Sequence, residues 1–572
     1  MAKRTNKPAL TPKTPLSLPI QADKTTPPAS AQPKTNTVLT YAPYFFLALI
    51  ALFMSFTRSQ FFDIGMERDE GIYSYFGKLL LAGKTPYIDL YETRFPGTFY
   101  MYAVLVGIFG YTIKGVAVGM LVLNLLSMLL LYSLSSQLLN KSAGVVAAAS
   151  FACLSLAPAV SGFSRQSEHI VVFWSLLSIW LMLKALKSEK KIQFILSGVC
   201  MCMAMLVKPN AVYLIIAGGF LLLAKYLTEA PINWKKLLLH GVLYSIGVFG
   251  MFGLMCLAMV IQGAWSEFWY FAVVEAGKYS EGIPWTQGKD MFNMTYNNLS
   301  EKYGAFIWLS YIGLIGVWFS GNALYKKIGI LILFLLGFWT VTPGLRFYGH
   351  YWLMWMPFVA LGVGAVFYTL QKIIDRYLSS PSWSPYVSLL FIVPFLMHVN
   401  GNKDYYFSPK HRQILRQTYG TNPFPEAQKI SEFIAKQVKE GDKLALVGSE
   451  PQTYIYTGCD SPTRHAYFSY LMADTLKTPL AKEWQKEYMA DLEREKPRFI
   501  VFYSHNISIL ANPNSDVKFF QWLDPFLGQN YKRIAVADIL DANNTKYAWG
   551  EAEANVYQPQ NRQQCVYVFE RK

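Results

Sequence analysis

The residues best suited to chemistry are charged side chains in short polar stretches between long apolar runs. Two acids stand together in the stretch ERDEGIYSY, as Asp69 and Glu70. A carboxylate of this kind takes a proton from a hydroxyl group, and an Arg or Lys side chain holds a phosphate. The matching cations are Arg94 in YETRFP, Arg165 in SRQSE, Lys208 between two apolar runs and Arg346 in TPGLRFYGHYW.

The composition is that of a membrane protein. Of the 572 residues, 53% are hydrophobic and 15% are charged, whereas soluble domains carry about a quarter charged residues. The apolar residues gather in runs of roughly 17–25, long enough to cross a hydrocarbon core about 30 Å thick. Eleven runs are predicted spans: 41–57, 116–139, 143–160, 169–187, 192–207, 209–226, 237–262, 304–320, 328–343, 350–371 and 384–398.

Lysine-rich turns give each span a direction, because short cytoplasmic loops carry an excess of Lys and Arg. The formal charge of +16 is divided between the N-terminal tail and these turns, which indicates topology rather than a nucleic-acid partner. We therefore expect a cytoplasmic N-terminus and an extracytoplasmic C-terminus. The marking residues are Lys184, Lys187, Lys190, Lys191, Lys225, Lys235, Lys236, Lys326, Lys327, Lys372 and Arg376.

The same orientation places three polar loops on the outer face, at 58–115, 161–168 and 263–303. The 344–349 turn and Lys208 join them there. The apolar stretch 97–112 begins and ends outside, so it is predicted to lie in the outer leaflet as an interfacial segment. All of the candidate residues thus fall on one side of the membrane.

Three regions are expected along the chain. Residues 1–40 are polar and are predicted to form a disordered cytoplasmic tail, and residues 41–399 form the membrane domain. Residues 400–572 form an extracytoplasmic domain in which helices alternate with strands, as in a small α/β layer. Its two cysteines, Cys459 and Cys565, could form a disulfide, but their spacing in the sequence does not decide whether they do. The predicted elements are helix 425–440, strand 443–448, helix 480–496, strand 498–503, helix 517–527, strand 531–537 and a strand near 565–570.

The acids have a plain structural explanation beside the chemical one. Asp69 suits the N-cap of the following helix, and Glu70 suits its first turn, where the helix dipole favours an acid. Apolar residues recur three or four apart from Ile72 to Leu80, so this helix is able to lie on a membrane surface. The sequence alone does not choose between the two roles.

The cations and aromatic residues are also open to two interpretations. Arg94 suits either headgroup contact or a phosphate, and the loop carrying Arg165 and Glu168 is short enough to be merely solvated. Lys208 goes against the orientation rule, which marks it as a functional candidate. His350 has no second His or acid at the spacing of a metal site, so the sequence contains no clear metal ligands and leaves a divalent ion as an open alternative.

The order of these motifs resembles the polytopic GT-C-fold glycosyltransferases, the family of the protein O-mannosyltransferases and the lipid A aminoarabinose transferase. The resemblance covers roughly residues 41–400. Members carry an Asp-Glu pair in the first outer loop, followed by Tyr and a Gly-x-x-Pro-Tyr turn. Asp69-Glu70, Tyr73 and Gly83-Lys84-Thr85-Pro86-Tyr87 are similar to that signature.

Later motifs match with changes. Arg94-Phe95-Pro96 stands where members have Lys-Pro-Pro, and Arg165-Gln166-Ser167-Glu168 stands where they have Arg-x-x-x-Asp. Lys208-Pro209 and Arg346 with His350-Tyr351 complete the pattern. The resemblance implies that Asp69, Glu70 and Glu168 are catalytic, and that Arg94, Arg165, Lys208 and Arg346 bind the donor phosphate. It assigns Tyr73, Tyr87, His350 and Tyr351 to substrate binding.

The predicted fold is therefore an α-helical polytopic membrane protein of GT-C type with interfacial helices and a C-terminal α/β domain. The predicted function is an inverting transfer of a hexosyl or pentosyl sugar from a polyprenyl-phosphate donor to an extracytoplasmic acceptor, a hydroxyl or phosphate of a protein, lipid or glycan. A transporter or flippase for lipid-linked saccharides is the alternative, although neither inverted repeats nor midplane polar residues are evident. An inactive relative that serves as a scaffold is a third, disfavoured by the retained Asp69-Glu70 pair.

Overall fold

The computed structural model describes residues 37–280, 283–377 and 381–572. Most of the predicted tail, residues 1–36, lies outside these ranges. Residues up to Ala42 form a unit of their own, of which only the first turns of helix α1 are described. The second unit is Pro43–Lys572.

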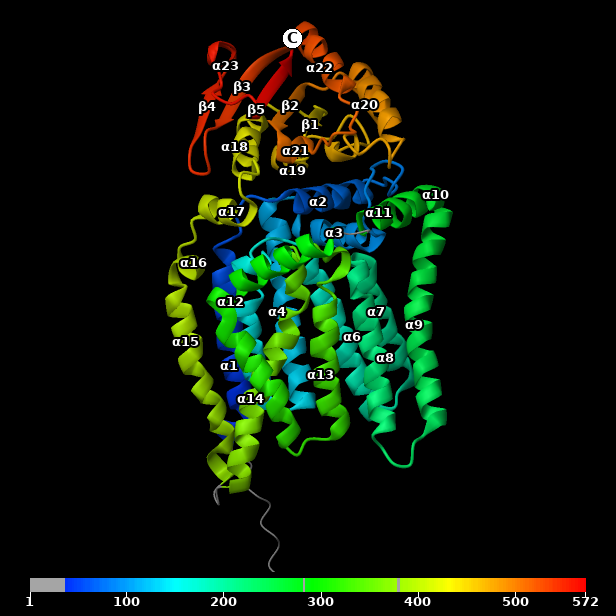
Figure 1. Ribbon diagram of the computed structural model, residues 1–572, viewed down its shortest axis with the longest axis vertical. Helices are drawn as coiled ribbons and strands as arrows, with labels where there is room; N and C mark the ends of the chain where they lie inside the picture. Colours follow the sequence, from blue (N-terminus) through cyan, green and yellow to red (C-terminus); the bar gives the residue numbers. More distant parts are fainter. Residues whose placement is uncertain (1–36, 281–282, 378–380) are drawn as a thin grey trace, which may run out of the picture. The chain divides into compact units, whose positions relative to one another are not determined.

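Long apolar helices form most of this unit, and every predicted span falls on a helical segment (Figure 1). Eight helical segments of the described chain are long and apolar enough to cross a membrane. This confirms a multi-pass membrane protein. The helices are α1 (Thr37–Ser59), α4 (Ile113–Leu138), α5 (Lys141–Leu154), α6 (Glu168–Ser188), α7 (Lys191–Val207), α8 (Val212–Leu227), α9 (Trp234–Ile261), α12 (Trp285–Gly316), α13 (Leu324–Trp339), α14 (Met356–Tyr377) and α15 (Ile392–Gly401), the last preceded by the 3-10 segment η7 (Pro381–Phe391).

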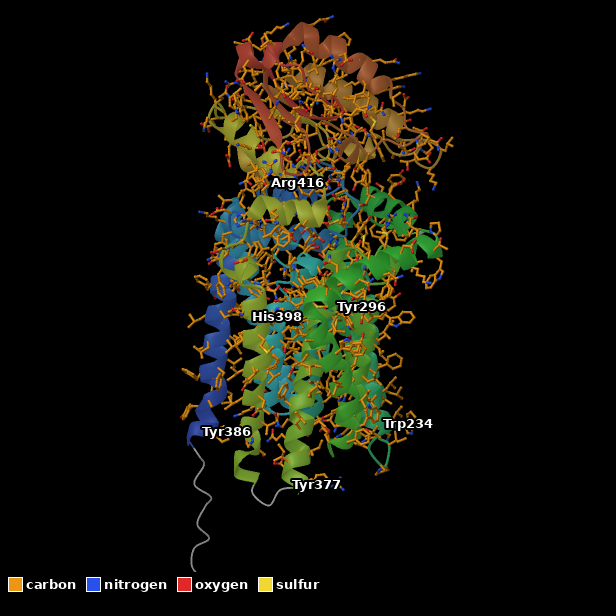
Figure 2. All side chains as sticks on the ribbon, turned by 60° about the vertical axis from the view of Figure 1, so that its left-hand side comes forward. Trp234, Tyr296, Tyr377, Tyr386, His398 and Arg416 are labelled. Atoms are coloured by element: carbon orange, nitrogen blue, oxygen red, sulfur yellow. The ribbon has the colours of Figure 1, made fainter. Side chains whose placement is uncertain are left out.

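The lysine-bearing turns gather at one end of the helices. Lys236 donates to Glu189 across two of these turns, and Lys326 lies against the end of α4. Figure 2 shows Trp234, Tyr377 and Tyr386 at the same end, whereas Arg416 lies at the other, beside the α/β domain. Tyr and Trp favour the two membrane–water interfaces. The candidate site and the lysines therefore occupy opposite ends.

Two short helices, α2 (Arg68–Leu81) and α3 (Pro96–Phe109), lie across the ends of the long ones (Figure 1). Glycines allow the close approach that this crossing requires. A Cβ on Gly77 would meet the backbone of Tyr102 in α3 at 2.8 Å, and one on Gly97 would meet Leu206 in α7 at 2.6 Å. The segment expected to be interfacial is thus a helix packed crosswise on the bundle.

The stretch 263–303, expected as a loop, is largely helical. It contains α10 (Trp265–Phe268), the π-helical turn η3 (Trp269–Glu275) and α11 (Ala276–Ser280), and α12 begins at Trp285. The first turns of α12 are polar, and one face of them packs against the turn that contains Leu345 and Phe347. Gly288 packs closely on Leu345, and Thr295 donates to the carbonyl of Phe347 at 3.0 Å.

The C-terminal region contains a five-stranded sheet in the order β1-β2-β5-β3-β4. β1 pairs with β2 in parallel, with Leu444 opposite Phe499, and the other pairings are antiparallel. The strands are β1 (Leu444–Val447), β2 (Phe499–His505), β3 (Tyr531–Ile539), β4 (Thr545–Trp549) and β5 (Gln564–Arg571). The accompanying helices are α16 (Lys403–Phe407), α17 (His411–Tyr419), α18 (Phe424–Ala435), α19 (Gln452–Thr457), α20 (Ala481–Glu495), α21 (Asn506–Ile509), α22 (Lys518–Asn530) and α23 (Glu551–Val556).

The predicted helices and strands of this domain are confirmed, and β4 and the short helices α16, α17, α19, α21 and α23 are additions. β4 is a short edge strand in which Lys546 is exposed and only Ala548 is buried, so the sequence lacks a clear apolar alternation there. Cys459 and Cys565 are both free. The Cys565 thiol lies instead against Asp538 and the carbonyl of Asn561.

The α/β domain packs directly on α2. Arg68 donates to Glu450 at 3.2 Å, Lys78 pairs with Asp460 at 2.7 Å, and a Cβ on Gly71 would meet the backbone nitrogen of Gln452 at 2.3 Å. The first turn of α19 therefore touches the backbone of α2. This contact fixes where the α2 acids lie relative to the domain.

We expect Gly71→Ala to destabilise this packing by about 1–3 kcal/mol, because the added methyl group overlaps backbone that cannot turn away. The measurement is the midpoint of thermal unfolding, together with the rate of proteolysis between the membrane helices and the α/β domain. Gly219→Ala on α8 is the matched control, since its added Cβ meets no atom within 4 Å. Equal midpoints for the two variants would contradict the tight packing.

Candidate active site

Helix α2 begins at the acids, and Glu67 is its N-cap. The Glu67 carboxylate accepts from the backbone N–H of Glu70 at 2.9 Å, so the interpretation of Asp69 as the N-cap is wrong. Asp69 and Glu70 both lie in the first turn, as expected for Glu70. The backbone N–H groups at a helix start favour acids there, and a capping Glu67 leaves the Asp69 side chain free for other partners.

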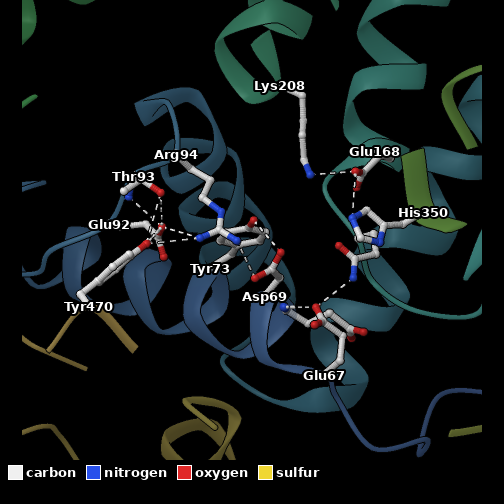
Figure 3. A network of polar contacts seen from close by, with 12 residues as sticks. Glu67, Asp69, Tyr73, Glu92, Thr93, Arg94, Glu168, Lys208, His350 and Tyr470 are labelled. Atoms are coloured by element: carbon white, nitrogen blue, oxygen red, sulfur yellow. Dashed lines mark hydrogen bonds and ion pairs between the residues drawn. The ribbon is translucent and has the colours of Figure 1, made fainter. Parts of the chain in front are cut away.

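Asp69 and Arg94 form an ion pair at the centre of the site (Figure 3). The Arg94 Nη2 donates to Asp69 Oδ1 at 2.8 Å, and the Tyr73 hydroxyl donates to Asp69 Oδ2 at 3.3 Å. The guanidinium also lies over the Tyr73 ring, 5.7 Å from its centre. The Asp69 and Arg94 side chains remain 14% and 28% exposed, so both are accessible to a ligand.

A second group of residues faces this pair (Figure 3). Lys208, between α7 and α8, pairs with Glu168 at the start of α6 at 2.8 Å. His350 Nε2 lies 3.8 Å from the same Glu168 oxygen, and the Lys208 ammonium lies 5.1 Å from the centre of the Tyr351 ring. Residues far apart in the sequence are thus brought to one place.

The charges of the two groups act on one another. Burial would raise the pKa of Asp69, but the nearby cations Arg94 and Lys208 outweigh it and hold that pKa below its ordinary value. Burial lowers the pKa of His350, so its ring is neutral at neutral pH. The two nearby cations therefore favour the ionised form of Asp69.

Glu70 and Arg165 lie apart from this pair, in the interior. Arg165 Nη1 donates to Glu70 Oε2 at 3.2 Å, and the Arg165 and Glu70 side chains are 2% and 1% exposed. Nη1 also donates to the backbone carbonyl of Ile64, and Nη2 donates to the carbonyls of Phe61 and Phe62. Burial raises the pKa of Glu70, although Arg165 opposes this effect. Together these residues anchor the chain that leads into α2.

Tyr87 and the turn that contains Arg346 have unusual backbone conformations. The Tyr87 hydroxyl donates to the carbonyl of Arg94 at 2.6 Å, and its own backbone has a φ of 64°, an uncommon conformation that ordinary residues keep only when their surroundings impose it. Arg346 is half-buried in a turn in which Gly344, Leu345 and Phe347 all have positive φ. This turn directs the chain toward His350.

Glu92 and Tyr470 belong to the site and were not among the predicted residues. Arg94 Nη1 donates to Glu92 Oε1 at 2.6 Å, and the Tyr470 hydroxyl donates to the same oxygen at 2.7 Å. Glu92 stands two positions before Arg94 in YETRFP, so the sequence did contain a signal for it. Tyr470 comes from the α/β domain, 376 residues away from Arg94, and nothing in its local sequence indicates the contact.

The described part of the chain contains no cluster of three or more His, Cys, Asp or Glu side chains that could hold a metal ion. The acids Asp69, Glu92 and Glu168 are paired with cations.

Glu67 gives the site a pH dependence. Burial raises its pKa from 4.5 to about 8, and the negative charges of Asp69 and Glu70 add to this effect. The folded chain binds this proton more tightly than the unfolded chain does. The stability that the proton confers is complete below the unfolded pKa and is lost as the pH rises to about 8.

We expect Glu67→Gln to flatten the fall in thermal unfolding midpoint between pH 5 and pH 8, because Gln keeps the acceptor oxygen and cannot ionise. Thermal unfolding of both proteins across this pH range is the measurement. Glu229→Gln, at an exposed residue, is the control and should follow the wild-type profile. Parallel profiles for wild type and Glu67→Gln would contradict the raised pKa.

Comparison with known proteins finds similar folds. A family model described as dolichyl-phosphate-mannose-protein mannosyltransferase matches residues 93–258. The crystal structure of ArnT from Cupriavidus metallidurans bound to undecaprenyl phosphate is similar, with a TM-score of 0.55 and 12% identity over 92% of this chain and 98% of that one. ArnT in the apo state gives 0.50 and 13% identity over 93% and 98%.

The archaeal oligosaccharyltransferase AglB from Archaeoglobus fulgidus, in complex with an inhibitory peptide and a dolichol-phosphate, gives a TM-score of 0.48 at 12% identity, over 92% of this chain and 75% of that one. No curated protein sequence matches the chain. The fold is that of the polytopic GT-C glycosyltransferases, and the chain resembles ArnT and the protein mannosyltransferases.

Proposed function

We propose that this chain, which has the GT-C fold, is a glycosyltransferase that moves a sugar from a polyprenyl-phosphate donor to an acceptor hydroxyl or phosphate. The observation that carries the proposal is the accessible Asp69–Arg94 pair facing Lys208 and Glu168. An acid beside phosphate-binding cations at the end of a helical bundle suits a lipid-phosphate donor. The similar fold of an ArnT that binds undecaprenyl phosphate supports this donor class.

In this proposal Asp69 is the general base. Its carboxylate takes the proton of the acceptor hydroxyl as the acceptor oxygen attacks C1 of the sugar. The C1–O bond to the phosphate breaks on the opposite face, and its electron pair leaves with the polyprenyl phosphate. A single displacement of this kind inverts the configuration at C1. The energy comes from the activated donor, so no nucleotide is needed.

Arg94 and Lys208 hold the leaving phosphate. Both are cations paired with acids, Arg94 with Asp69 and Lys208 with Glu168. Charge-assisted bonds from an Arg fork to a phosphate are among the stronger hydrogen bonds in proteins. A donor phosphate therefore competes with the acids for these cations and replaces them as the partner.

This exchange prepares the base. Arg94 is the largest of the influences that hold the pKa of Asp69 down. When the donor phosphate neutralises Arg94, Asp69 loses part of that influence and its affinity for a proton rises. Asp69 thus becomes a stronger base when the donor is in place, which couples proton transfer to donor binding.

The other residues position these groups. Tyr73 holds the second oxygen of Asp69, and Tyr87 holds the backbone of Arg94. We assign the buried pair of Glu70 and Arg165 to anchoring α2 rather than to contact with substrate, because neither side chain is accessible. Glu168 orients Lys208, and His350, Tyr351 and Arg346 complete that side of the site.

The site and the α/β domain lie outside the cytoplasm in this proposal, in the plasma membrane of a bacterium. The lysines at the other end of the helices support this orientation, since basic turns remain in the cytoplasm. A polyprenyl-linked donor then enters from the outer leaflet, and the acceptor arrives beneath the α/β domain.

Mass spectrometry of lipids from cells that lack this chain tests the proposal. We expect a polyprenyl-phosphate sugar to accumulate and one extracytoplasmic glycan, lipid or protein to lose a single sugar. Complementation with the wild-type gene should reverse both changes. A lipid profile that is unchanged on deletion would contradict a transferase that consumes such a donor.

A further inference from the structure

We propose that the C-terminal α/β domain is part of the donor site, with Tyr470 as a positioning residue that holds Arg94 ready for the phosphate. This inference rests on the proposed function, since it takes Arg94 as the phosphate-binding cation. It assigns a specific task to a domain that sequence patterns describe only as a small α/β layer.

The Glu92 carboxylate is one of the points at which the α/β domain contacts the membrane domain. Its Oε1 accepts from the backbone N–H of Thr93 at 2.7 Å, from Arg94 Nη1 at 2.6 Å and from the Tyr470 hydroxyl at 2.7 Å. Glu92 is fully buried, and its other oxygen has no hydrogen-bond partner within the described chain. All of the bonds that orient this acid are therefore made at one oxygen.

Tyr470 also reaches the neighbours of Glu92. Its hydroxyl lies 3.2 Å from the Thr93 hydroxyl and 3.4 Å from Arg94 Nη1, as Figure 3 shows. Arg94 is consequently fixed from two sides, by Asp69 at Nη2 and by the Glu92–Tyr470 pair at Nη1. When a phosphate replaces Asp69, only the Glu92–Tyr470 side still holds the guanidinium in place.

The α/β domain holds Tyr470 firmly. Tyr470 ends the 3-10 segment η8 (Phe468–Tyr470), whose Phe468 is buried in the core of the domain. The backbone N–H of Ser469 donates to the Ser449 hydroxyl at 3.1 Å. On the other side, the backbone N–H of Tyr91 donates to the carbonyl of Arg464 at 3.1 Å. The segment that carries Glu92 and Arg94 is thus attached to the domain at two points.

Binding of farnesyl phosphate in detergent micelles, followed by calorimetry, tests the role of Tyr470, with farnesol as the probe that lacks the phosphate. We expect Tyr470→Phe to weaken farnesyl phosphate binding by about tenfold, as for the loss of one hydrogen bond to a charged group. Tyr531→Phe is the matched control, because it removes a hydroxyl bonded to the carbonyl of Pro497, away from the site. That variant should bind as the wild type does.

A double-mutant cycle separates positioning from general loosening of the domain. If Tyr470 acts through Arg94, Tyr470→Phe should have little further effect in an Arg94→Lys background. Equal binding by Tyr470→Phe and Tyr531→Phe, or an undiminished effect of Tyr470→Phe in that background, would overturn the inference. A wild type that binds farnesyl phosphate no better than farnesol would instead overturn the proposed donor site itself.

Discussion

Replacing Asp69 by Asn is expected to lower sugar transfer by about 10²–10⁴-fold, the range for loss of a general base. Asn keeps the size of the side chain and can still meet Tyr73, but its amide cannot accept the acceptor proton. Asp69 is 14% exposed and does not cap α2, so the fold should persist. The measurement is the initial rate of transfer from a polyprenyl-phosphate sugar, with the thermal unfolding midpoint recorded for the same preparation.

Asp63→Asn is the matched control for this change. Asp63 belongs to the same outer loop, and it pairs with Lys114 at 3.4 Å while both side chains are 66% exposed. The identical substitution there should leave transfer unchanged. Near-wild-type turnover by Asp69→Asn would show that proton transfer depends on another group.

Replacing Arg94 by Ala is expected to weaken donor binding by about 10–100-fold, because hydrogen bonds to charged groups contribute about 1.5–3 kcal/mol. Acceptor affinity should change much less, since Arg94 is placed on the leaving phosphate. The donor affinity of Arg94→Lys should lie between those of the wild type and Arg94→Ala, because Lys keeps the charge and loses the planar fork. Apparent donor and acceptor affinities from initial rates are the measurement.

Lys84→Ala provides the comparison for Arg94. Lys84 lies in the same loop, its side chain is 54% exposed, and its ammonium lies 3.5 Å from Asp89 Oδ1. Its removal takes away one positive charge without touching the site. If Arg94→Ala and Lys84→Ala affected donor affinity equally, the effect would be one of net charge, and Arg94 would not be the phosphate ligand.

The sequence predicted the membrane architecture well because that architecture depends on patterns that the bilayer imposes. The apolar runs predicted the spans. The lysine-bearing turns, which include Lys236 and Lys326, lie at one end of the helices as predicted. The start of α12 was missed for a physical reason. Its first turns are polar, and the contacts that hold them, from Gly288 and Thr295, come from a distant turn.

The site was predicted in part for similar reasons. Asp69 and Arg94 lie 25 residues apart in one loop, so the expectation that they share a face needed only the topology. Glu70 follows Asp69 directly, yet a helix points successive side chains in different directions, and Glu70 faces the interior. The contact of Tyr470 with Glu92 depends on how the α/β domain packs on α2, and short sequence motifs do not encode that packing.

The most direct test of the account is a transfer assay with purified protein in liposomes that contain radiolabelled polyprenyl-phosphate sugars and an extract of the host envelope as acceptor. We predict that the wild type releases free polyprenyl phosphate as label moves to the acceptor, and that Asp69→Asn does neither while Asp63→Asn does both. Label that crosses the bilayer still attached to its lipid, or release that is equal for wild type and Asp69→Asn, would contradict the account.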